Sequence, residues 1–261
     1  MNPPISVCII GLNEEEKIED CLRSVVEVAD EIVYVDSYSG DKTVEIARKY
    51  TDRIVLQKFL GHVEQKNLAI DEAKHDWVLA LDCDERLSPE AIAEIKAIWA
   101  DQAEKIATEE IRAVRFNRLT YYIYRFIRHS GWYPDSKIRL FNRKYCRWQG
   151  ENPHDIVHCD SKYLYKSKTD ILHYSFDSIS DHLKTIDSFS RIAAHEAYEK
   201  GKRVGLFSLV FRSLWVGVRK MFFEFAFLDG AAGVILTGLS IASTWAKYSR
   251  LYILCRHSKK P

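Results

Sequence analysis

The stretch Trp77-Val78-Leu79-Ala80-Leu81-Asp82-Cys83-Asp84-Glu85 decides the fold. Its first five residues are apolar, which is typical of a strand buried on both faces of a helix-covered parallel sheet. The stretch then ends in three carboxylates within four positions, and a buried carboxylate without a partner is costly. Because open α/β sheets bind ligands at the carboxyl ends of their strands, we expect Asp82 and Asp84 to lie in a ligand-binding crevice.

The spacing of these carboxylates suggests a metal site. Asp82 and Asp84 are two residues apart, so on an extended chain they point to the same side. Two such oxygen ligands suit Mg²⁺ or Mn²⁺, with a diphosphate completing the coordination shell. For an isolated Asp-x-Asp, a solvated turn before a helix starting near Ser88 is the better explanation. The choice between a metal site and a solvated turn depends on the features of the rest of the sequence.

Strands and helices alternate through the first part of the chain. The apolar runs Ile5–Ile10 and Glu31–Asp36 are each followed by a helical pattern. This order predicts an α/β fold with a mostly parallel sheet and flanking helices, in which right-handed crossovers bring the carboxyl ends of the strands to one edge. Asn13, Asp36 and Asp82 follow three such strands and are predicted to share a polar crevice.

Asn13 is also a candidate helix cap. We expect it to begin a helix over roughly residues 14–26, because its side chain can accept a hydrogen bond from the first turn. The acids Glu14 and Glu15 follow it, and they suit the positive end of a helix dipole.

A later segment, residues 151–158, holds two carboxylates and two histidines in eight positions. Such a segment could supply a general base beside an acceptor hydroxyl, and a polar loop is the alternative interpretation. His173 is a candidate metal ligand, although a histidine satisfied within a sheet accounts for it more simply.

Charge divides the chain in two. Of its 38 Lys and Arg and 37 Asp and Glu, residues 201–261 hold ten and two, which gives +8 there and −7 over residues 1–200. We predict an α/β domain over 1–180 and a helical region over 181–261. The basic residues lie in an apolar tail rather than on a polar face, which argues against nucleic acid as a partner. The six cysteines form no Cys-x-x-Cys pair and indicate a reduced, cytosolic protein.

The basic tail predicts a membrane-associating helical appendage. Val204–Phe227 is rich in aromatic residues and carries Arg212 and Arg219 seven positions apart, the pattern of an interfacial helix. Gly230–Ala246 is a run of 17 uncharged residues, short of the about 20 that a span needs. We therefore expect the region to lie on the inner-membrane surface, with its cations facing anionic head groups. A membrane span, an oligomer interface and a helical cap on the domain remain alternatives.

Three motifs resemble those of the family 2 glycosyltransferases, which have a GT-A fold. They are Val7–Glu15, Val35–Thr43, and Gln65–Asn67 followed by Trp77–Glu85. The resemblance covers about residues 4–160. The chain more narrowly resembles the lipopolysaccharide-core glucosyltransferases related to the heptose-modifying enzymes. This narrower resemblance comes from Gly131–Asp135, Lys137–Phe141 and Phe227–Gly233.

The resemblance implies that the domain over 1–180 is the nucleotide-sugar-binding and catalytic one. It implies a nucleotide-diphosphate sugar donor, UDP-glucose before other UDP-sugars, and Mg²⁺ or Mn²⁺ as cofactor. Asp36 would meet the uracil, Asp82 the ribose or uracil side, and Asp84 the metal. The remaining donor-binding residues that it implies are Asn13, Glu14 and Lys66. Lys66 stands where the family often has Arg.

The resemblance also implies the reaction. The family's base is an acid that follows a His, which here is Asp155, with Glu151 in reserve. The reaction would be a single inverting displacement onto a glycan or glycolipid acceptor of the bacterial envelope. A polyprenyl-phosphate glycosyltransferase and a non-catalytic nucleotide-sugar-binding scaffold are the alternatives. The sequence leaves open the sugar, the acceptor and whether the protein forms a homo-oligomer.

Overall fold

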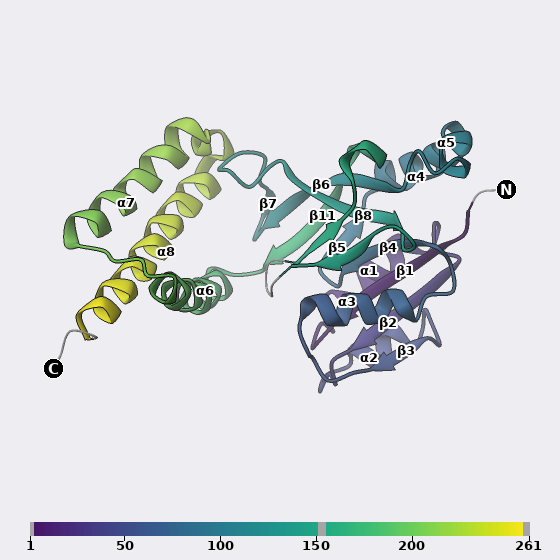
Figure 1. Cartoon of the computed structure of the whole chain (residues 1–261), viewed down its shortest axis with the longest axis horizontal. Helices are drawn as coiled ribbons and strands as arrows, with labels where there is room; N and C mark the ends of the chain where they lie inside the picture. The colour runs from purple at the N-terminus through teal and green to yellow at the C-terminus, as the bar shows by residue number, and fades with distance from the viewer. Residues whose placement is uncertain (1–2, 151–154, 258–261) are drawn as a thin grey trace. The chain divides into compact units, whose positions relative to one another are not determined.

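The computed structural model describes residues 3–150 and 155–257 (Figure 1). Contacts divide the chain into two units. The first runs to Leu119 and resumes from Asp135 to His173, and the second comprises Thr120–Pro134 and the chain from Tyr174 onward. The domain boundary near residue 180 stays a prediction.

A mixed sheet forms the first unit, and two of its strands, β6 and β11, continue into the second. Its strand order is β3-β2-β1-β4-β8-β6-β11-β5. The neighbours from β3 to β4 are parallel, whereas β4 with β8, β8 with β6 and β11 with β5 are antiparallel. The predicted α/β sheet with flanking helices is thus confirmed, with its parallel part in β1–β4. The bounds are β1 Ile5–Gly11, β2 Glu31–Asp36, β3 Ile54–Leu56, β4 Trp77–Asp82, β5 Glu85–Leu87, β6 Ala113–Tyr122, β8 Asp135–Asn142 and β11 Leu164–Phe176.

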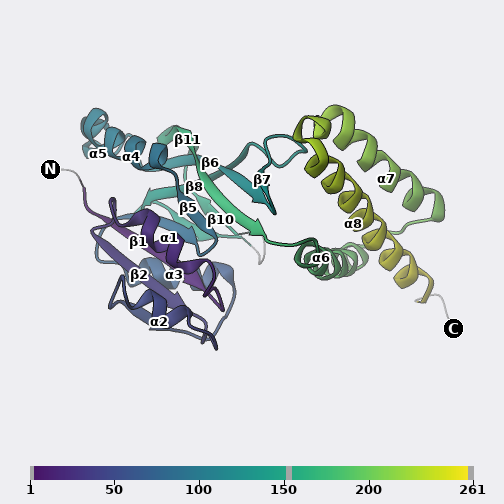
Figure 2. The ribbon, with the colours of Figure 1, turned by 180° about the vertical axis from the view of Figure 1, so that it is seen from behind.

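Helices cover both faces of the parallel strands (Figure 1, Figure 2). On one face Val7 and Ile9 of β1 join the core formed by α1, α2 and α4, while on the other Cys8 joins the core formed with α3. Burial on both faces explains why these strands are continuous apolar runs. The bounds are α1 Ile18–Val25, α2 Thr43–Ala47, α3 His62–Asp71, α4 Pro89–Asp101 and α5 Ala103–Ala107. Short pieces complete the unit: β9 Arg147–Gln149, β10 Ile156–His158 and a 3₁₀ turn at Ser161–Tyr163.

The carboxyl ends of the parallel strands meet at one edge. Gly11 pairs with Asp36 across β1 and β2, and Ile10 pairs with Asp82 across β1 and β4. The predicted convergence is confirmed. The expectation that Asp82 and Asp84 point the same way along an extended chain is wrong, because β4 ends at Asp82 and a turn follows at residues 83–84.

The predicted cap at Asn13 is also wrong. Helix α1 begins at Ile18 and has no side-chain cap. Asn13 has a φ of 56°, a left-handed conformation that Asn tolerates better than most residues. Its side-chain oxygen accepts a hydrogen bond from Gly40 N at 2.8 Å, so it closes the loop after β1 against the loop after β2.

In the second unit the predicted helix over 204–227 ends early. Helix α7 stops at Val218, and a π-helical turn follows at Arg219–Phe223 and a 3₁₀ turn at Ala226–Asp229. The turn is tied down by Lys220, whose buried Nζ donates to Ser130 O at 2.6 Å and Glu224 Oε2 at 3.1 Å. The other elements of this unit are α6 Ile179–Glu199, α7 Leu206–Val218, α8 Gly230–His257 and β7 Arg125–Phe126.

Asp229 ties the start of α8 to the loop at residues 128–130. Its buried carboxylate accepts hydrogen bonds from the backbone of Arg128 at 3.1 Å and His129 at 3.0 Å, and from Ser130 Oγ at 2.8 Å. The segment Ala226–Arg256, which includes α8 except for its last residue, is long and apolar enough to cross a membrane by length and composition, and 33% of its apolar window is buried. One side of α8 packs on α6 and α7.

Candidate active site

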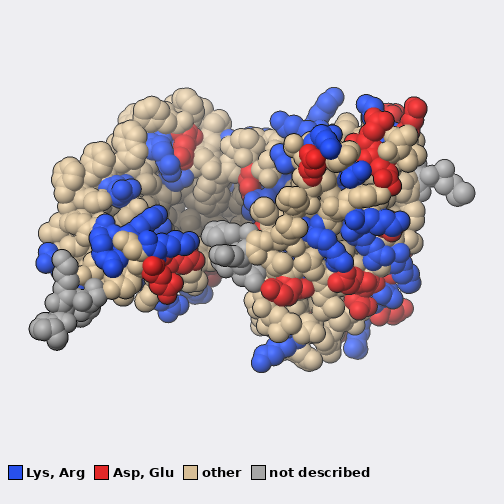
Figure 3. Space-filling view, in the orientation of Figure 1, with Lys and Arg blue, Asp and Glu red and all other residues tan. Residues whose placement is uncertain are grey.

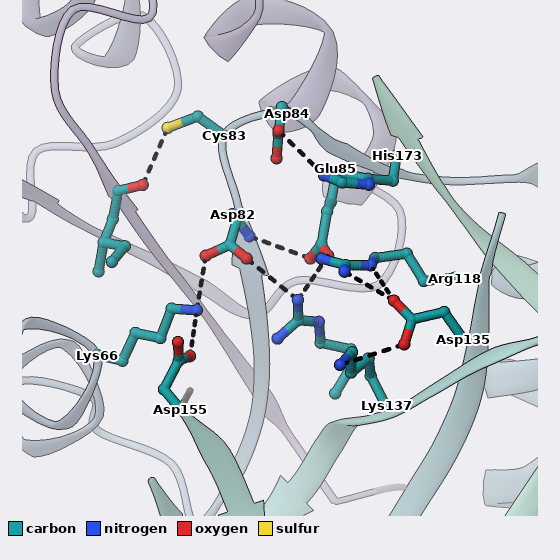
Figure 4. A network of polar contacts seen from close by, with 12 residues as sticks. Lys66, Asp82, Cys83, Asp84, Glu85, Arg118, Asp135, Lys137, Asp155 and His173 are labelled. Carbon is teal, nitrogen blue, oxygen red and sulfur yellow. Dashed lines mark hydrogen bonds and ion pairs between the residues drawn. The ribbon is translucent and has the colours of Figure 1, made fainter. Parts of the chain in front are cut away.

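Lys66 of α3 joins two distant carboxylates at the end of β4. Its Nζ lies 2.9 Å from Asp82 Oδ1 and 2.8 Å from Asp155 Oδ2 (Figure 4). The same Nζ lies 4.4 Å from the centroid of the Trp148 ring, a favourable cation–π distance. The predicted donor residue Lys66 and the predicted base Asp155 are therefore neighbours, although 89 positions separate them in the sequence.

Two arginines from the antiparallel strands extend this network. Arg139 Nη2 lies 3.1 Å from Asp82 Oδ2 and 2.5 Å from Glu85 Oε1. Arg118 in turn reaches Glu85 at 3.3 Å and Asp135 at 2.7 Å. Glu85 is completely buried and Arg139 is 4% exposed, so this is an interior chain of alternating charges.

The network fixes the charge states of Asp82 and Arg139. Burial alone would raise the pKa of Asp82, but Lys66 and Arg139 outweigh it and hold that pKa below its usual range. Burial likewise favours a lower pKa for Arg139, but Glu85 and Asp82 raise it above its usual value. Both groups are therefore charged at neutral pH.

Asp84 faces away from this network, toward β11. Its Oδ2 lies 3.2 Å from His173 Nε2 (Figure 4). His173 is brought there because it pairs with Glu85 across β11 and β5. Among the described residues no group of three or more His, Cys, Asp or Glu could hold a metal ion. Asp84 and His173 fit two positions of a Mg²⁺ or Mn²⁺ shell that diphosphate oxygens and water would complete.

The loops after β1 and β2 hold the predicted nucleoside residues. Asp36 is completely buried and accepts hydrogen bonds from Tyr34 Oη at 2.9 Å, Ser39 N at 2.7 Å and Ser39 Oγ at 2.6 Å. These three bonds occupy three of the about four lone-pair sites of the Asp36 carboxylate. Glu14 N donates to Thr43 Oγ1 at 2.8 Å, which ties the Asn13–Glu14 turn to α2.

A cavity of about 450 Å³ opens beside Asp82 and Asp155. This volume lies within the range of about 300–1,000 Å³ that is usual for ligand sites. Its lining comes from β4, β6, β8, β9 and β10, with Lys66 from α3. The reserve base Glu151 lies outside the described residues.

Comparison with known proteins identifies the family. The model of the family described as glycosyl transferase family 2 matches residues 6–171. An uncharacterized glycosyltransferase of Rickettsia conorii is 30% identical over 271 residues, which covers 98% of this chain and 91% of the relative. This chain is a family 2 glycosyltransferase.

Two further similarities are more distant. The lipopolysaccharide core biosynthesis glycosyltransferase LpsC of Rhizobium meliloti is 27% identical to this family 2 glycosyltransferase, over 98% of the chain and 94% of the relative. Among solved structures, the mannosyltransferase PcManGT of Pyrobaculum calidifontis, in complex with GDP-Man and Mn²⁺, aligns with a TM-score of 0.49 and 15% identity, over 99% of this chain and 80% of that one.

Sequence reasoning missed several side chains of this glycosyltransferase's site. Arg118, Arg139 and Trp148 contribute to the network, yet they lie on strands far from the Asp-x-Asp motif. For Arg139 the sequence offered two signals, the family resemblance of Lys137–Phe141 and the alternation of basic and apolar residues over Lys137–Arg143. That pattern predicts a strand but not which carboxylate each cation meets.

Proposed function

We propose that this family 2 glycosyltransferase transfers a hexose from a UDP-sugar, UDP-glucose in the first instance, to a lipopolysaccharide-core or related envelope glycan with inversion. The observation that carries the proposal is the Lys66 bridge between Asp82 and Asp155. The bridge connects Asp82, at the end of β4, to Asp155, the carboxylate that the family resemblance implies as the base.

Donor binding uses the strand edge. Asp36 and the Asn13–Glu14 turn contact the nucleoside, and Asp82 contacts the ribose. Asp84 and His173 would hold the divalent ion, which when bound would stabilise the negative charge of the departing diphosphate. The 3.2 Å contact between Asp84 and His173 supports this assignment, because it sets two metal-ligating side chains face to face.

The acceptor enters the cavity beside Asp155. Asp155 takes the proton from the acceptor hydroxyl. The acceptor oxygen then attacks the anomeric carbon of the donor sugar from the face opposite the diphosphate, and the bond between the sugar and the diphosphate breaks. Lys66 positions Asp155 before the donor arrives. The diphosphate then offers Lys66 a third anionic partner besides Asp82 and Asp155, which leaves the Asp155 carboxylate available to the acceptor. General-base catalysis of this kind contributes about 10²–10⁴-fold in rate.

We also infer that the second unit rests on an anionic membrane surface, the cytoplasmic face of the inner membrane. The outer face of α7 and the turn after it, defined here by Phe207, Phe211, Leu214, Phe222 and Phe223, is exposed, and Phe207 is 82% exposed. In Figure 3 the part of the surface over α7 and the turn after it is largely tan, with a few blue groups and a red one. Exposed Arg212 and Arg219 lie among these side chains, which is the pattern of an interfacial helix.

The experiment that tests this function measures which acceptor receives the labelled sugar. The full chain is incubated with radiolabelled UDP-glucose, Mn²⁺ and either deacylated core oligosaccharide or a polyprenyl phosphate. Label in the oligosaccharide is expected, whereas label only in the lipid would favour the polyprenyl-phosphate alternative. Asp155→Asn should lower turnover by about 100-fold or more while donor binding persists. Asp160→Asn, at an exposed site on the same segment, is the matched control and should retain activity.

A further inference from the structure

The cavity beside Asp155 holds one cation more than its carboxylate partners can neutralise. Five cationic side chains line it: Lys66, Arg115, Arg118, Lys137 and Arg139. Four of them pair with carboxylates, which are Asp82, Asp155, Glu85 and Asp135. Arg115 is the fifth, and no carboxylate of the described chain forms an ion pair with it.

Local backbone geometry directs Arg115 to the cavity. Its neighbours Val114 and Phe116 are 0% and 1% exposed and belong to the core on one face of the sheet. The pairing of β6 with β8 shifts register between Val114 and Arg115, where a β-bulge or irregularity interrupts the ladder. Bulges commonly re-aim a side chain beside an active site, and Arg115 lines the cavity while remaining partly exposed.

Arg115 also lies on the side of the cavity away from the predicted nucleoside site. Asn13 and Asp36 do not line the cavity, and their strands precede β4 in the order β2-β1-β4-β8-β6. β6 is two strands beyond β4, which corresponds to roughly 10 Å at the usual strand spacing. A ligand group at Arg115 therefore belongs to the part of the substrate farthest from the nucleoside.

We propose that Arg115 binds an acidic group of the acceptor, a phosphate or a carboxylate carried by the saccharide, so that this enzyme selects an anionic glycan. The proposal rests on the proposed transferase function and names its acceptor class. A guanidinium suits either acid because its planar fork donates two parallel hydrogen bonds. Lys137 of the neighbouring strand β8 also lines the cavity, but its charge is paired with Asp135 at 3.2 Å.

The experiment compares acceptors with and without each acid. The probes are deacylated core oligosaccharide, the same material freed of phosphate with hydrofluoric acid, and the same material with its carboxyl groups reduced. We expect one treatment to raise the acceptor KM of the wild type by about 10–100-fold, the range for loss of a charge-assisted hydrogen bond. Which treatment does so identifies the acid.

Substitution of Arg115 then locates the effect. Arg115→Gln should raise the KM for the untreated acceptor by the same factor, leave the donor KM unchanged, and have no further effect with the acceptor that lacks the acid. Arg115→Lys should recover part of the loss. Arg147→Gln, which removes an exposed cation outside the cavity, is the matched control.

Two results would overturn the inference, and they differ in meaning. If Arg115→Gln transfers normally to the untreated acceptor, or loses donor affinity instead, Arg115 does not read an acid on the acceptor. If the folded wild type binds no donor and transfers to none of the three acceptors, the proposed function fails and this inference fails with it.

Discussion

The end of β4 in the first unit and the outer face of α7 in the second unit both carry cations, but they use them differently. In the first, Lys66, Arg139 and Arg118 are held between carboxylates in the interior. In the second, Arg212 and Arg219 are exposed among large apolar side chains. The first arrangement is preorganised for a small charged ligand, and the second suits an extended anionic surface.

The contrast has an energetic basis. A buried charge is tolerated only with a partner in good geometry, so the residues at β4 constrain one another and define one shape. Exposed ion pairs contribute little to folding, and an exposed aromatic face gains free energy only when something covers it. Substitutions should therefore affect stability in the first region and association in the second.

The largest effect is expected from breaking the interior network. Arg139→Met leaves buried Glu85 with Arg118, at 3.3 Å, as its remaining ion-pair partner, and loss of one partner of a buried pair costs about 3–5 kcal/mol. Urea unfolding followed by circular dichroism measures it. The control is Arg147→Met, whose pair with Asp71 is exposed and should change stability by about 0.5 kcal/mol or less. Equal losses in the two variants would contradict the account of the network.

The second prediction concerns the outer face of α7. Changing both Phe207 and Phe222 to Ser should weaken binding to anionic vesicles by about 100-fold or more, since burying one such ring is worth about 1.5–3 kcal/mol. The unfolding free energy should hardly change, because both rings are exposed. Sedimentation with vesicles measures the binding. Leu183→Ser, at a similarly exposed site on α6, serves as control, and equal binding by all the proteins would exclude this face as the membrane contact.

Two glycines of α8 provide a matched pair of smaller effects. A Cβ on Gly233 would lie 1.8 Å from Ala226 O, whereas a Cβ on Gly238 meets nothing within 4 Å. Gly233→Ala should destabilise by about 1–3 kcal/mol through overpacking. Gly238→Ala should stabilise by about 0.5–1 kcal/mol through helix propensity. Thermal unfolding distinguishes them by sign, and a shift in the same direction would contradict the packing at the start of α8.

The smallest effect is a pH dependence at Asp135. Burial would raise its pKa, but Arg118 and Lys137 lower it below 3.8. The folded form therefore holds the ionised carboxylate to lower pH than the unfolded chain does, so its stabilisation is complete above pH 3.8 and disappears as the pH falls through the folded pKa. Asp135→Asn should thus cost about 1 kcal/mol or less at neutral pH and progressively less in acid. A difference that persists unchanged at pH 2.5 would contradict this.

Much of the first unit could be predicted from the sequence, because the apolar runs that end in Asp36 and Asp82 are local signals of buried parallel strands. The error at Asn13 has a local cause too, since its side chain bonds to Gly40 across two loops instead of capping α1. The end of α7 at Val218 could not be foreseen, because Lys220 is held by Ser130, 90 positions earlier in the chain.

In the candidate site too, local features could be predicted from the sequence and long-range contacts could not. The sequence indicates that Asp82 and Asp84 matter, since carboxylates at the end of a buried strand are rare without a purpose. The sequence gives no indication that Arg139 pairs with Asp82 or that His173 contacts Asp84, because both contacts depend on the register of the antiparallel strands. Such pairings arise from tertiary structure alone.

The most direct test of the account is donor binding by calorimetry. The full chain and Asp84→Asn, both shown to be folded, are titrated with UDP-glucose, UDP-galactose, UDP-N-acetylglucosamine and GDP-mannose, each with and without Mn²⁺. We predict that one UDP-sugar, UDP-glucose first, binds the wild type in a manner that requires Mn²⁺, and that Asp84→Asn loses that requirement together with most of the affinity. Absence of binding by every donor to the folded wild type would contradict the assignment of the β4 edge as the donor site.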